Sequence, residues 1–433
     1  MKHLLMLATA LSLPTIAPAK LSPVEAKMAA HVEAIYEPSV TLLQQLVDVN
    51  SGSMNFAGVE QVGRMMRAEL EPLGFRVEWK PMTAAKRAGH IFATHVGKPG
   101  TKRLLLIGHL DTVFEKDSPF QKFVRKGDFA EGPGAGDDKG GMVVILMALK
   151  AMKAAATLAG ANIEIALTGD EEDSGDPIEV ARADLIAAGK RADVALDFEG
   201  LIVEDGRDMG SIARRSSNSW TLTATGKAGH SSRIFSPGYG EGAVFELARI
   251  IAAFRKELPE PNLTFNVGLI AGGQSAVVDA DGVRASATGK TNIIPGIAIA
   301  KGDFRTLSED QTARVKTRMT AIVATHSPET SASIAFDPGG YPAMAPTEGN
   351  RTVLTALNVV NADLGLPEMP VLDPLKRGAG DISFVANDVS GLAGLGPSSK
   401  GDHAPGETVD LVSMKRQAKR AAILMTRLSG QRR

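Results

Sequence analysis

The order of the predicted strands and helices constrains the fold of this chain more than any other feature. Short apolar runs, such as residues 103–107, alternate with segments of helical spacing, such as residues 141–153. This alternation predicts an α/β domain with a mostly parallel sheet. Residues 220–336 interrupt it, because their order is β-α-β-β-α-β, the ferredoxin-like α+β unit. The sequence therefore predicts a mixed, mostly parallel α/β domain with an inserted ferredoxin-like domain.

The predicted domains follow from these elements. Residues 20–215 and 338–433 form the α/β domain in two parts, and residues 216–337 form the insert. The predicted helices span residues 27–49, 59–70, 141–153, 241–257, 308–325, 350–363 and 412–428. The predicted strands span residues 75–80, 103–107, 162–168, 192–198, 220–225, 263–270, 297–305 and 331–336.

The N-terminal residues are typical of a secretory signal peptide. A short basic start is followed by an apolar run over residues 4–13 and by Ala17-Pro18-Ala19, a small-x-small cleavage site. An uncleaved anchor is the alternative, but the apolar run is shorter than the ~20 residues that span a bilayer. We expect residues 1–19 to be removed after Ala19. The mature protein would then be periplasmic or secreted and free of the membrane.

Composition excludes several classes of function. The chain has 48 basic and 49 acidic residues, for a formal net charge of −1, so it lacks the basic excess of a nucleic-acid-binding protein. It has no cysteine, which excludes thiol catalysis, disulfides and cysteine-ligated metal. A Gly-x-Ser-x-Gly elbow is also absent, which argues against a serine hydrolase.

Histidines and carboxylates follow several of the predicted strands, where ligands gather in open α/β sheets. The candidates are His109 and Asp111, Asp137 and Asp138, Glu171 and Glu172, Glu199, and the late His403. Each pattern alone also fits a structural role, such as a tight turn, a helix N-cap or a solvated acidic loop. Together they predict a two-metal site with oxygen and nitrogen ligands. Without cysteine, zinc, cobalt or manganese suits such a site.

The order of the motifs resembles the M20 metallopeptidase family. The matching segments are residues 108–113 (GHLDTV), 132–141 (GPGAGDDKGG), 170–172 (DEE), 198–199 (FE), 226–230 (GKAGH) and 292–295 (NIIP), with His403 after them. The branch that they resemble most is the glutamate carboxypeptidase group, with acetylornithine and succinyl-diaminopimelate deacylases as relatives. The resemblance covers nearly all of the chain after residue 19.

The resemblance implies two zinc ions per chain, with cobalt or manganese as substitutes. Asp137 would bridge the ions, and the remaining ligands would be His109 and Glu199 for one, Glu172 and His403 for the other. Glu171 would be the general base that activates a metal-bridged water, and Asp111 would orient His109. The resemblance also implies a cis peptide bond between Asp137 and Asp138.

The resemblance further implies where the substrate binds. The substrate contacts would be His230, Asn292, Arg305 and Gly380. His230 would reach the active site of a partner subunit, so we expect a homodimer through the inserted domain, which would act as a lid. Glutamate-releasing relatives carry an arginine before the proline that follows the last lid strand. Tyr341 stands at that position here, which puts glutamate specificity in doubt and leaves Arg305 or Lys400 as other anchors.

The sequence therefore predicts an exported zinc-dependent exopeptidase of carboxypeptidase type, acting on a small peptide or an N-acyl amino acid. An N-acyl-amino-acid deacylase with the same chemistry is the first alternative. A non-catalytic relative that binds peptide or metal is the second, and a scaffold that dimerises through the lid is the third. A degenerate relative would lack the base or a metal ligand, and the sequence retains all of them.

Overall fold

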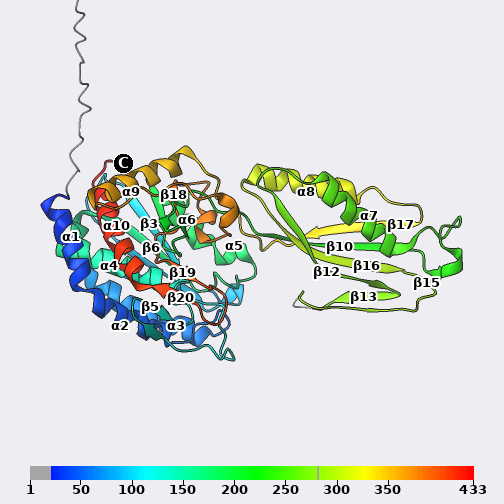
Figure 1. Ribbon diagram of the computed structural model, residues 1–433, viewed down its shortest axis with the longest axis horizontal. Helices are drawn as coiled ribbons and strands as arrows, with labels where there is room; N and C mark the ends of the chain where they lie inside the picture. The colour runs from blue at the N-terminus through cyan, green and yellow to red at the C-terminus, as the bar shows by residue number, and fades with distance from the viewer. Residues whose placement is uncertain (1–20, 280–281) are drawn as a thin grey trace, which may run out of the picture.

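The computed structural model describes residues 21–279 and 282–433, so the expected signal peptide lies outside the described residues. The molecule is elongated, with an α/β body at one end and a smaller sheet with two helices at the other (Figure 1). We call the smaller body the lid. Across the described ranges, no helix is long and apolar enough to cross a bilayer.

The α/β body is built on a six-stranded sheet of order β1-β2-β6-β3-β7-β18. Its strands are β1 (Arg76–Pro81), β2 (Gly89–His95), β3 (Arg103–His109), β6 (Asn162–Thr168), β7 (Val194–Asp197) and β18 (Gly391–Leu392). Strands β6, β3, β7 and β18 are parallel, and β2 runs antiparallel to both β1 and β6. The predicted mixed, mostly parallel sheet is confirmed. The sequence analysis missed β2.

Helices cover both faces of the sheet, which explains why β3 is apolar without alternation. Leu104 and Leu106 are buried in the core that contains helices α4 and α10, whereas Leu105 and Ile107 are buried in a second core with α6 (Figure 1). The helices of this body are α1 (Pro23–Ala34), α2 (Tyr36–Val47), α3 (Phe56–Leu70), α4 (Lys139–Ala154), α5 (Ile178–Ala181), α6 (Ala183–Arg191), α9 (Glu348–Asp363) and α10 (Leu411–Ser429).

The single helix predicted over residues 27–49 is wrong, because the structure has two helices that meet at Ile35. Pro38 explains the break. A proline inside a helix has no N–H to donate and its ring clashes with the carbonyl four residues earlier, here that of Ala34. The helix predicted over residues 59–70 begins earlier, at Phe56, because the Asn55 side chain accepts from the Gly58 amide and caps it.

The lid contains a four-stranded antiparallel sheet of order β12-β16-β10-β17. Its elements follow the chain as β10 (Asn218–Gly226), α7 (Gly242–Glu257), β12 (Thr264–Gly273), β16 (Ile297–Arg305), α8 (Glu309–Val323) and β17 (Thr330–Phe336). This is the predicted β-α-β-β-α-β order. The helices pack on the sheet over a core that includes Trp220, Phe254 and Phe304.

Both bodies also contain short strands outside their main sheets. In the lid they are β11 (Gly229–His230), β13 (Ser275–Val278), β14 (Ala285–Thr288) and β15 (Ile293–Ile294). In the α/β body they are β4 (Val124–Lys126), β5 (Phe129–Glu131), β8 (Val203–Glu204), β9 (Arg207–Asp208), β19 (Ser399–Lys400) and β20 (Thr408–Asp410). Strands β19, β20, β5 and β4 form a small sheet of their own, which brings residues 399–410 beside the glycine-rich turn after β5.

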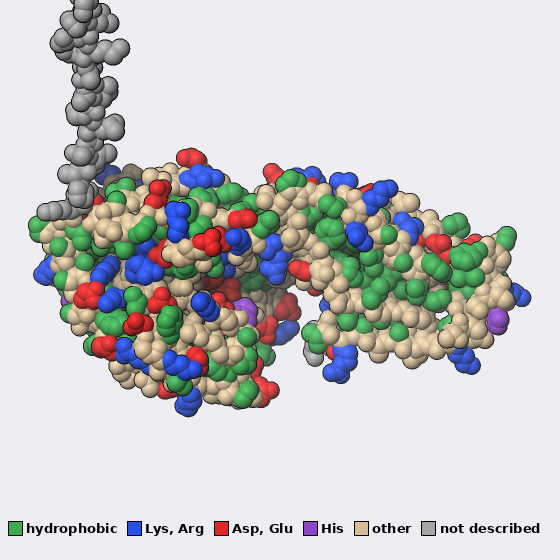
Figure 2. Space-filling model, in the orientation of Figure 1, with side chains coloured by type: hydrophobic (Ala, Val, Ile, Leu, Met, Phe, Trp, Pro, Cys, Tyr) green, Lys and Arg blue, Asp and Glu red, His purple; other side chains and the backbone are tan. Residues whose placement is uncertain are grey.

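The chain crosses between the two bodies twice, and the two crossing segments are paired. Arg214 forms an antiparallel bridge with Met344, and Ser217 forms one with Tyr341. Figure 2 shows an open notch between the two bodies, with acidic and histidine side chains on its α/β wall. The domain boundaries predicted near these crossings stay predictions.

Candidate metal centre and active site

His109 is the last residue of β3, and its imidazole lies between two aspartates. Its Nδ1 is 3.1 Å from the carbonyl oxygen of Asp111 and 3.4 Å from the Asp111 carboxylate, while its Nε2 is 3.0 Å from Oδ1 of Asp137. Burial lowers the pKa of His109, but the hydrogen bonds to the two aspartates outweigh it and raise that pKa well above its usual value. Asp111 therefore contacts the imidazole of His109 through both its backbone carbonyl and its carboxylate.

Asp137 lies between the two predicted histidine ligands. Its Oδ1 faces His109, and its Oδ2 is 3.1 Å from Nε2 of His403. Burial raises the pKa of Asp137, but the bonds to both histidines lower it below its usual range. The Asp137–Asp138 peptide bond is cis, as the resemblance implied. Asp138 is buried beneath this turn, and its Oδ2 accepts from the His109 amide at 3.3 Å.

Glu407 holds the glycine-rich turn that carries Asp137. Its Oε1 accepts from the amides of Gly136 and Asp137 at 2.7 and 3.1 Å, and its Oε2 accepts from the amide of Gly134 at 3.0 Å. Gly134 has a φ of 70°, which favours glycine. Burial raises the pKa of Glu407 to about 7. The sequence analysis did not predict Glu407, because nothing local links it to residues 134–137.

Glu171 and Glu172 lie on the turn after β6, and Asp111 holds this turn as well. The Asp111 carboxylate accepts from the amides of Glu171 and Glu172 at 3.0 and 3.1 Å, and from the hydroxyl of Ser53 at 2.6 Å. Oε2 of Glu172 is 3.3 Å from Nε2 of His403. Asp111 therefore positions the predicted base and two predicted ligands, His109 and Glu172, at once.

Burial and mutual repulsion disfavour the charged forms of Glu171 and Glu172. Burial, followed by the negative charge of Asp137, raises the pKa of Glu172 to about 11. Burial, together with the charge of Glu199, raises the pKa of Glu171 well above its usual value. A bound cation reverses this repulsion. The donor set fits a borderline or hard metal, since it consists of imidazole nitrogens and carboxylate oxygens.

The structure brings most of the predicted ligands together. His109, Asp137 and Glu172 each offer a ligand atom, and these atoms all lie within 4.8 Å of one another. His403 contacts both Asp137 and Glu172. Glu199, at the end of β7, is outside this group. Its Oε2 accepts from the guanidinium of Arg214, and its buried Oε1 has no hydrogen-bond partner among the described residues.

A pocket of about 360 Å³, lined by four acidic and four basic side chains besides His403, adjoins the cluster. Asp137, Glu171, Glu199 and His403 line it, and so do four basic side chains, those of Arg214, Arg305, Lys376 and Arg377. Arg377 is buried, and its Nη1 donates to the carbonyl of Gly200 at 2.6 Å. No described residue accepts a hydrogen bond from its Nε. The sequence analysis did not predict Arg214 or Arg377.

The predicted substrate contacts fall in two places. Arg305, the last residue of β16, lines the pocket, and Gly380 adjoins it. A Cβ atom at position 380 would lie 2.5 Å from Oε1 of Glu199, so glycine leaves room for that oxygen. His230 and Asn292 lie far from the cluster, because β11 and β15 form the outer end of the lid (Figure 1). Within one chain, these two residues do not reach the site.

Tyr341 does not replace the missing arginine as a substrate anchor. Its side chain is buried and does not line the pocket, and its hydroxyl donates to the carbonyl oxygen of Glu171 at 2.9 Å. Tyr341 therefore supports the turn that carries Glu171. Lys400, the other proposed anchor, is exposed and is not among the residues that line the pocket.

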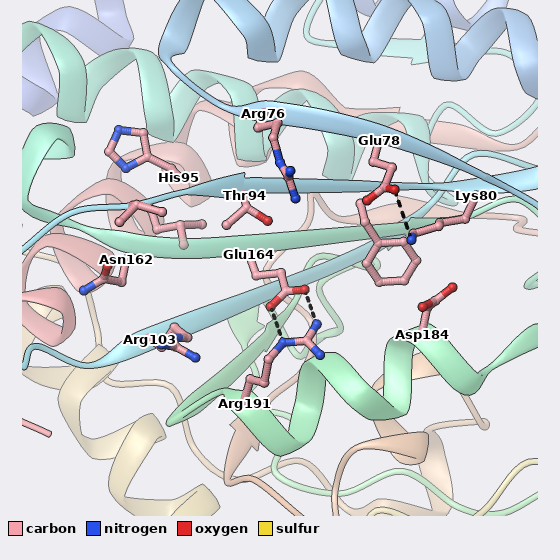
Figure 3. A pocket seen from close by; sticks show the side chains of 13 residues that line it. Arg76, Glu78, Lys80, Thr94, His95, Arg103, Asn162, Glu164, Asp184 and Arg191 are labelled. Atoms are coloured by element: carbon pink, nitrogen blue, oxygen red, sulfur yellow. Dashed lines mark hydrogen bonds and ion pairs between the residues drawn. The ribbon is translucent and has the colours of Figure 1, made fainter. Parts of the chain in front are cut away.

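A larger hollow, of about 480 Å³, lies at the opposite end of the sheet (Figure 3). It includes Arg103, the first residue of β3, whereas the metal cluster begins at His109, the last. Charged side chains in this hollow pair with each other, as Arg191 does with Glu164 at 2.6 Å. The hollow has no cluster of buried carboxylates and histidines like the one around Asp137, so we place the active site at the smaller pocket.

Comparison with known proteins agrees with this assignment. Residues 105–427 match Peptidase family M20/M25/M40. The chain is 30% identical over 326 residues to carboxypeptidase G2 of Pseudomonas sp. (strain RS-16), a match that covers 73% of this chain and 71% of that protein. It is 27% identical over 406 residues to succinyl-diaminopimelate desuccinylase of Acidovorax ebreus (strain TPSY), covering 87% of this chain and 95% of that one.

Solved structures share the fold. A tripeptidase from Staphylococcus aureus superposes with a TM-score of 0.69 at 18% identity, covering 92% of this chain and 99% of that one. A dinuclear metal-binding peptidase of the M20 family from Bacillus subtilis gives a TM-score of 0.62 at 15% identity, covering 92% and 99%. The carboxypeptidase G2 match agrees with the predicted glutamate carboxypeptidase-like branch. The chain therefore belongs to peptidase family M20/M25/M40 and is a metallo-hydrolase of peptide or amide bonds.

Proposed function

We propose that the protein is an exported, zinc-dependent exopeptidase that releases a C-terminal amino acid from a small peptide or an N-acyl amino acid. The observation that carries the proposal is the presence of basic side chains, Arg305 and Arg377 among them, in the pocket beside the metal cluster. Guanidinium groups bind carboxylates with directional, charge-assisted hydrogen bonds. A substrate with a free carboxylate close to the scissile amide would therefore place that amide next to Asp137 and Glu171.

Five residues would hold two zinc ions: Asp137 between them, His109 and Glu199 at one, and Glu172 and His403 at the other. When bound, such ions lower the pKa of water and polarise the scissile carbonyl. The contact of His109 Nδ1 with Asp111 leaves Nε2 available as a ligand. Arg214 would keep Glu199 oriented, since its guanidinium bonds one carboxylate oxygen and leaves the other without a partner among the described groups.

Glu171 is the group that moves the proton. It lines the pocket beside the cluster and lies on the turn that Asp111 holds through two amides. Glu171 would accept the proton of the attacking water and then return it to the leaving amine, so no covalent intermediate is required. Arg305 and Arg377 would hold the substrate carboxylate during both transfers.

The second candidate is an N-acyl-amino-acid deacylase that uses the same residues. The desuccinylase relative favours it, since its alignment covers 95% of that protein. The basic side chains of the pocket suit either substrate, because both classes carry a free carboxylate. The non-catalytic and scaffold alternatives are less well supported, because Glu171 and all five proposed ligands are present and four of the ligands lie together.

Homodimerisation through the lid and export remain part of the proposal. A dimer would explain why His230 and Asn292 lie at the outer end of the lid, since each could then serve the site of the partner subunit. Export with cleavage after Ala19 rests on residues outside the described range. Mass spectrometry of the protein recovered after expression would give its N-terminus, and sedimentation would give its oligomeric state.

The test of the proposed activity is metal-restored hydrolysis. The purified protein is stripped with a chelator, zinc is added back, and a panel of dipeptides and N-acyl amino acids is assayed with and without a free terminal carboxylate. We expect hydrolysis that requires zinc, prefers the free carboxylate and disappears in Glu171→Ala. Glu164→Ala, at the other end of the sheet, is the matched control. Two bound zinc ions without turnover on any substrate would contradict the enzymatic proposal.

A further inference from the structure

Tyr341 lies in the segment by which the chain returns from the lid to the α/β body. Its backbone is tied to the outgoing segment, because the amide of Tyr341 donates to the carbonyl of Ser217 at 2.9 Å and the amide of Ser217 donates back at 3.0 Å. Its ring reaches beneath the active-site turn and contacts the ring of Phe384, with centroids 4.8 Å apart. One residue thus belongs to the crossing and touches the turn.

The Tyr341 hydroxyl uses all of its hydrogen-bonding capacity. It donates to the carbonyl of Glu171 at 2.9 Å, and it accepts from Nη2 of Arg182 at 2.8 Å and from the hydroxyl of Ser174 at 3.0 Å. The partners Glu171 and Ser174 lie at the two ends of the same turn. A phenol in this position therefore fixes both the place and the direction of the Glu171 carbonyl.

Arg182 extends the connection to the other side of the pocket. It is fully buried, and it donates to Oδ1 of Asp170 at 2.6 Å, to the carbonyl of Asp170 at 3.1 Å and to Oδ1 of Asp381 at 2.8 Å. Asp170 precedes Glu171, and Asp381 follows Gly380, the predicted substrate contact. The second oxygen of Asp381 accepts from the hydroxyl of Thr168, at the end of β6. Arg182 thus joins the turn that carries Glu171 to the segment that carries Gly380.

This network has one well-defined arrangement. The guanidinium and the two carboxylates are buried together, and moving one partner would leave a buried charge without compensation. Neither Tyr341 nor Arg182 lines the pocket or belongs to the metal cluster. Their contacts are with the backbone and the flanking aspartates of the residues that do.

We propose that Tyr341 and Arg182 are positioning residues that couple the lid crossing to Glu171. A displacement of the lid moves the crossing segment, and the Tyr341 hydroxyl carries that movement to the Glu171 carbonyl. Because Arg182 bonds both Asp170 and Asp381, the turn that carries Glu171 and the segment that carries Gly380 move together. The base is thus in place only when the crossing holds the geometry that it has here. The inference rests on the proposed role of Glu171 as the base.

The test is Tyr341→Phe in the full chain, which keeps the ring packing and removes only the hydroxyl. Tyr36→Phe, at the start of α2, is the matched control. We expect kcat to fall about 10- to 100-fold with KM little changed, because a misplaced base slows chemistry more than it weakens binding. We expect hydrogen exchange of residues 169–176 to become faster while the rest of the chain matches the control.

A double-mutant cycle tests whether Tyr341 acts through Glu171. Aspartate is one methylene shorter than glutamate. In Glu171→Asp the carboxylate is therefore misplaced even while the Tyr341 hydroxyl holds the backbone carbonyl of residue 171. We expect the loss of kcat in the double variant to be smaller than the product of the two single losses. Independent, multiplicative losses would overturn the coupling, and so would faster exchange of residues 169–176 with unchanged kcat.

The exchange experiment also separates this inference from the proposed function. Unchanged exchange of residues 169–176 in Tyr341→Phe overturns the positioning role, whatever the activity. If the unaltered protein hydrolyses nothing on the panel, the proposed function fails. The exchange result still decides whether the Tyr341 hydroxyl holds the turn.

Discussion

Glu407→Gln tests how the metal centre is held. The carboxylate of Glu407 accepts three backbone amides, those of Gly134, Gly136 and Asp137. Glutamine has nearly the same size but only one acceptor oxygen. If that oxygen keeps the bonds to Gly136 and Asp137, its NH₂ group must face the amide of Gly134, which is a donor facing a donor. The turn that carries Asp137 therefore loses one support, and the other two weaken.

The magnitude follows from two opposing terms. A hydrogen bond to a charged group contributes about 1.5–3 kcal/mol, so losing one of the three costs about that much. A neutral amide is cheaper to bury than a carboxylate, and burial is what raises the pKa of Glu407 to about 7. The two terms partly cancel. A residue that supports a metal ligand typically changes affinity by 10- to 100-fold, or about 1.4–2.8 kcal/mol, and we expect a loss in this range.

The assay is competition for zinc between the protein and an indicator dye at neutral pH. Glu164→Gln is the matched control, because its carboxylate lies at the opposite end of β6 and pairs with Arg191. Circular dichroism shows whether both variants keep their fold. An affinity of Glu407→Gln equal to that of the control would refute the reasoning that the amide contacts of Glu407 hold Asp137 in place.

Three further predictions concern the pocket and the lid. Arg377→Ala should raise KM for substrates with a free carboxylate and leave amidated substrates unaffected, measured by initial rates. Phe254→Ala should lower the free energy of unfolding by about 3–5 kcal/mol in a urea titration, since Phe254 is buried in the lid core. Burial raises the pKa of Glu246, but Arg249 and the Ser327 amide outweigh it and lower that pKa to about 2. Lid stability should therefore fall between about pH 4.5 and pH 2, by up to about 3 kcal/mol, and Glu246→Gln should remove that dependence.

The fold and most of the metal ligands could be predicted because their signals are local. An apolar run such as residues 103–107 indicates a strand buried on both faces, and the periodicity of residues 220–336 indicates the lid. His109 and Glu172 lie close to the ends of their own strands, so parallel pairing of β3 with β6 brings them to one edge of the sheet. His403 follows none of the predicted strands, and its assignment as a ligand beside Glu172 came only from the resemblance of the motif order.

Contacts between residues that are distant in the sequence were decided by the tertiary structure. Glu407 and Gly136 are 271 residues apart, and Tyr341 and Glu171 are 170 apart. No periodicity or motif links such pairs, so the clamp on the Asp137 turn and the support beneath Glu171 could not be predicted. Tyr341 shows the difference most clearly, because its place in the sequence indicated only that an arginine is missing there, and its hydroxyl bonds the carbonyl of Glu171 in the fold.

The sequence by itself determined the α/β architecture with its lid and the chemical types of the groups at the metal centre. Hydrophobic periodicity and strand-end motifs involve residues that are close together in the sequence, so they can be recognised without the structure. Only the tertiary structure decided which buried charges face one another, such as Arg182 with Asp170 and Asp381 or Arg214 with Glu199. The energy of a buried polar group depends on partners within about 3 Å in space. The packing of the two bodies and of the segments that connect them determines those partners, and they are distant from each other in the sequence.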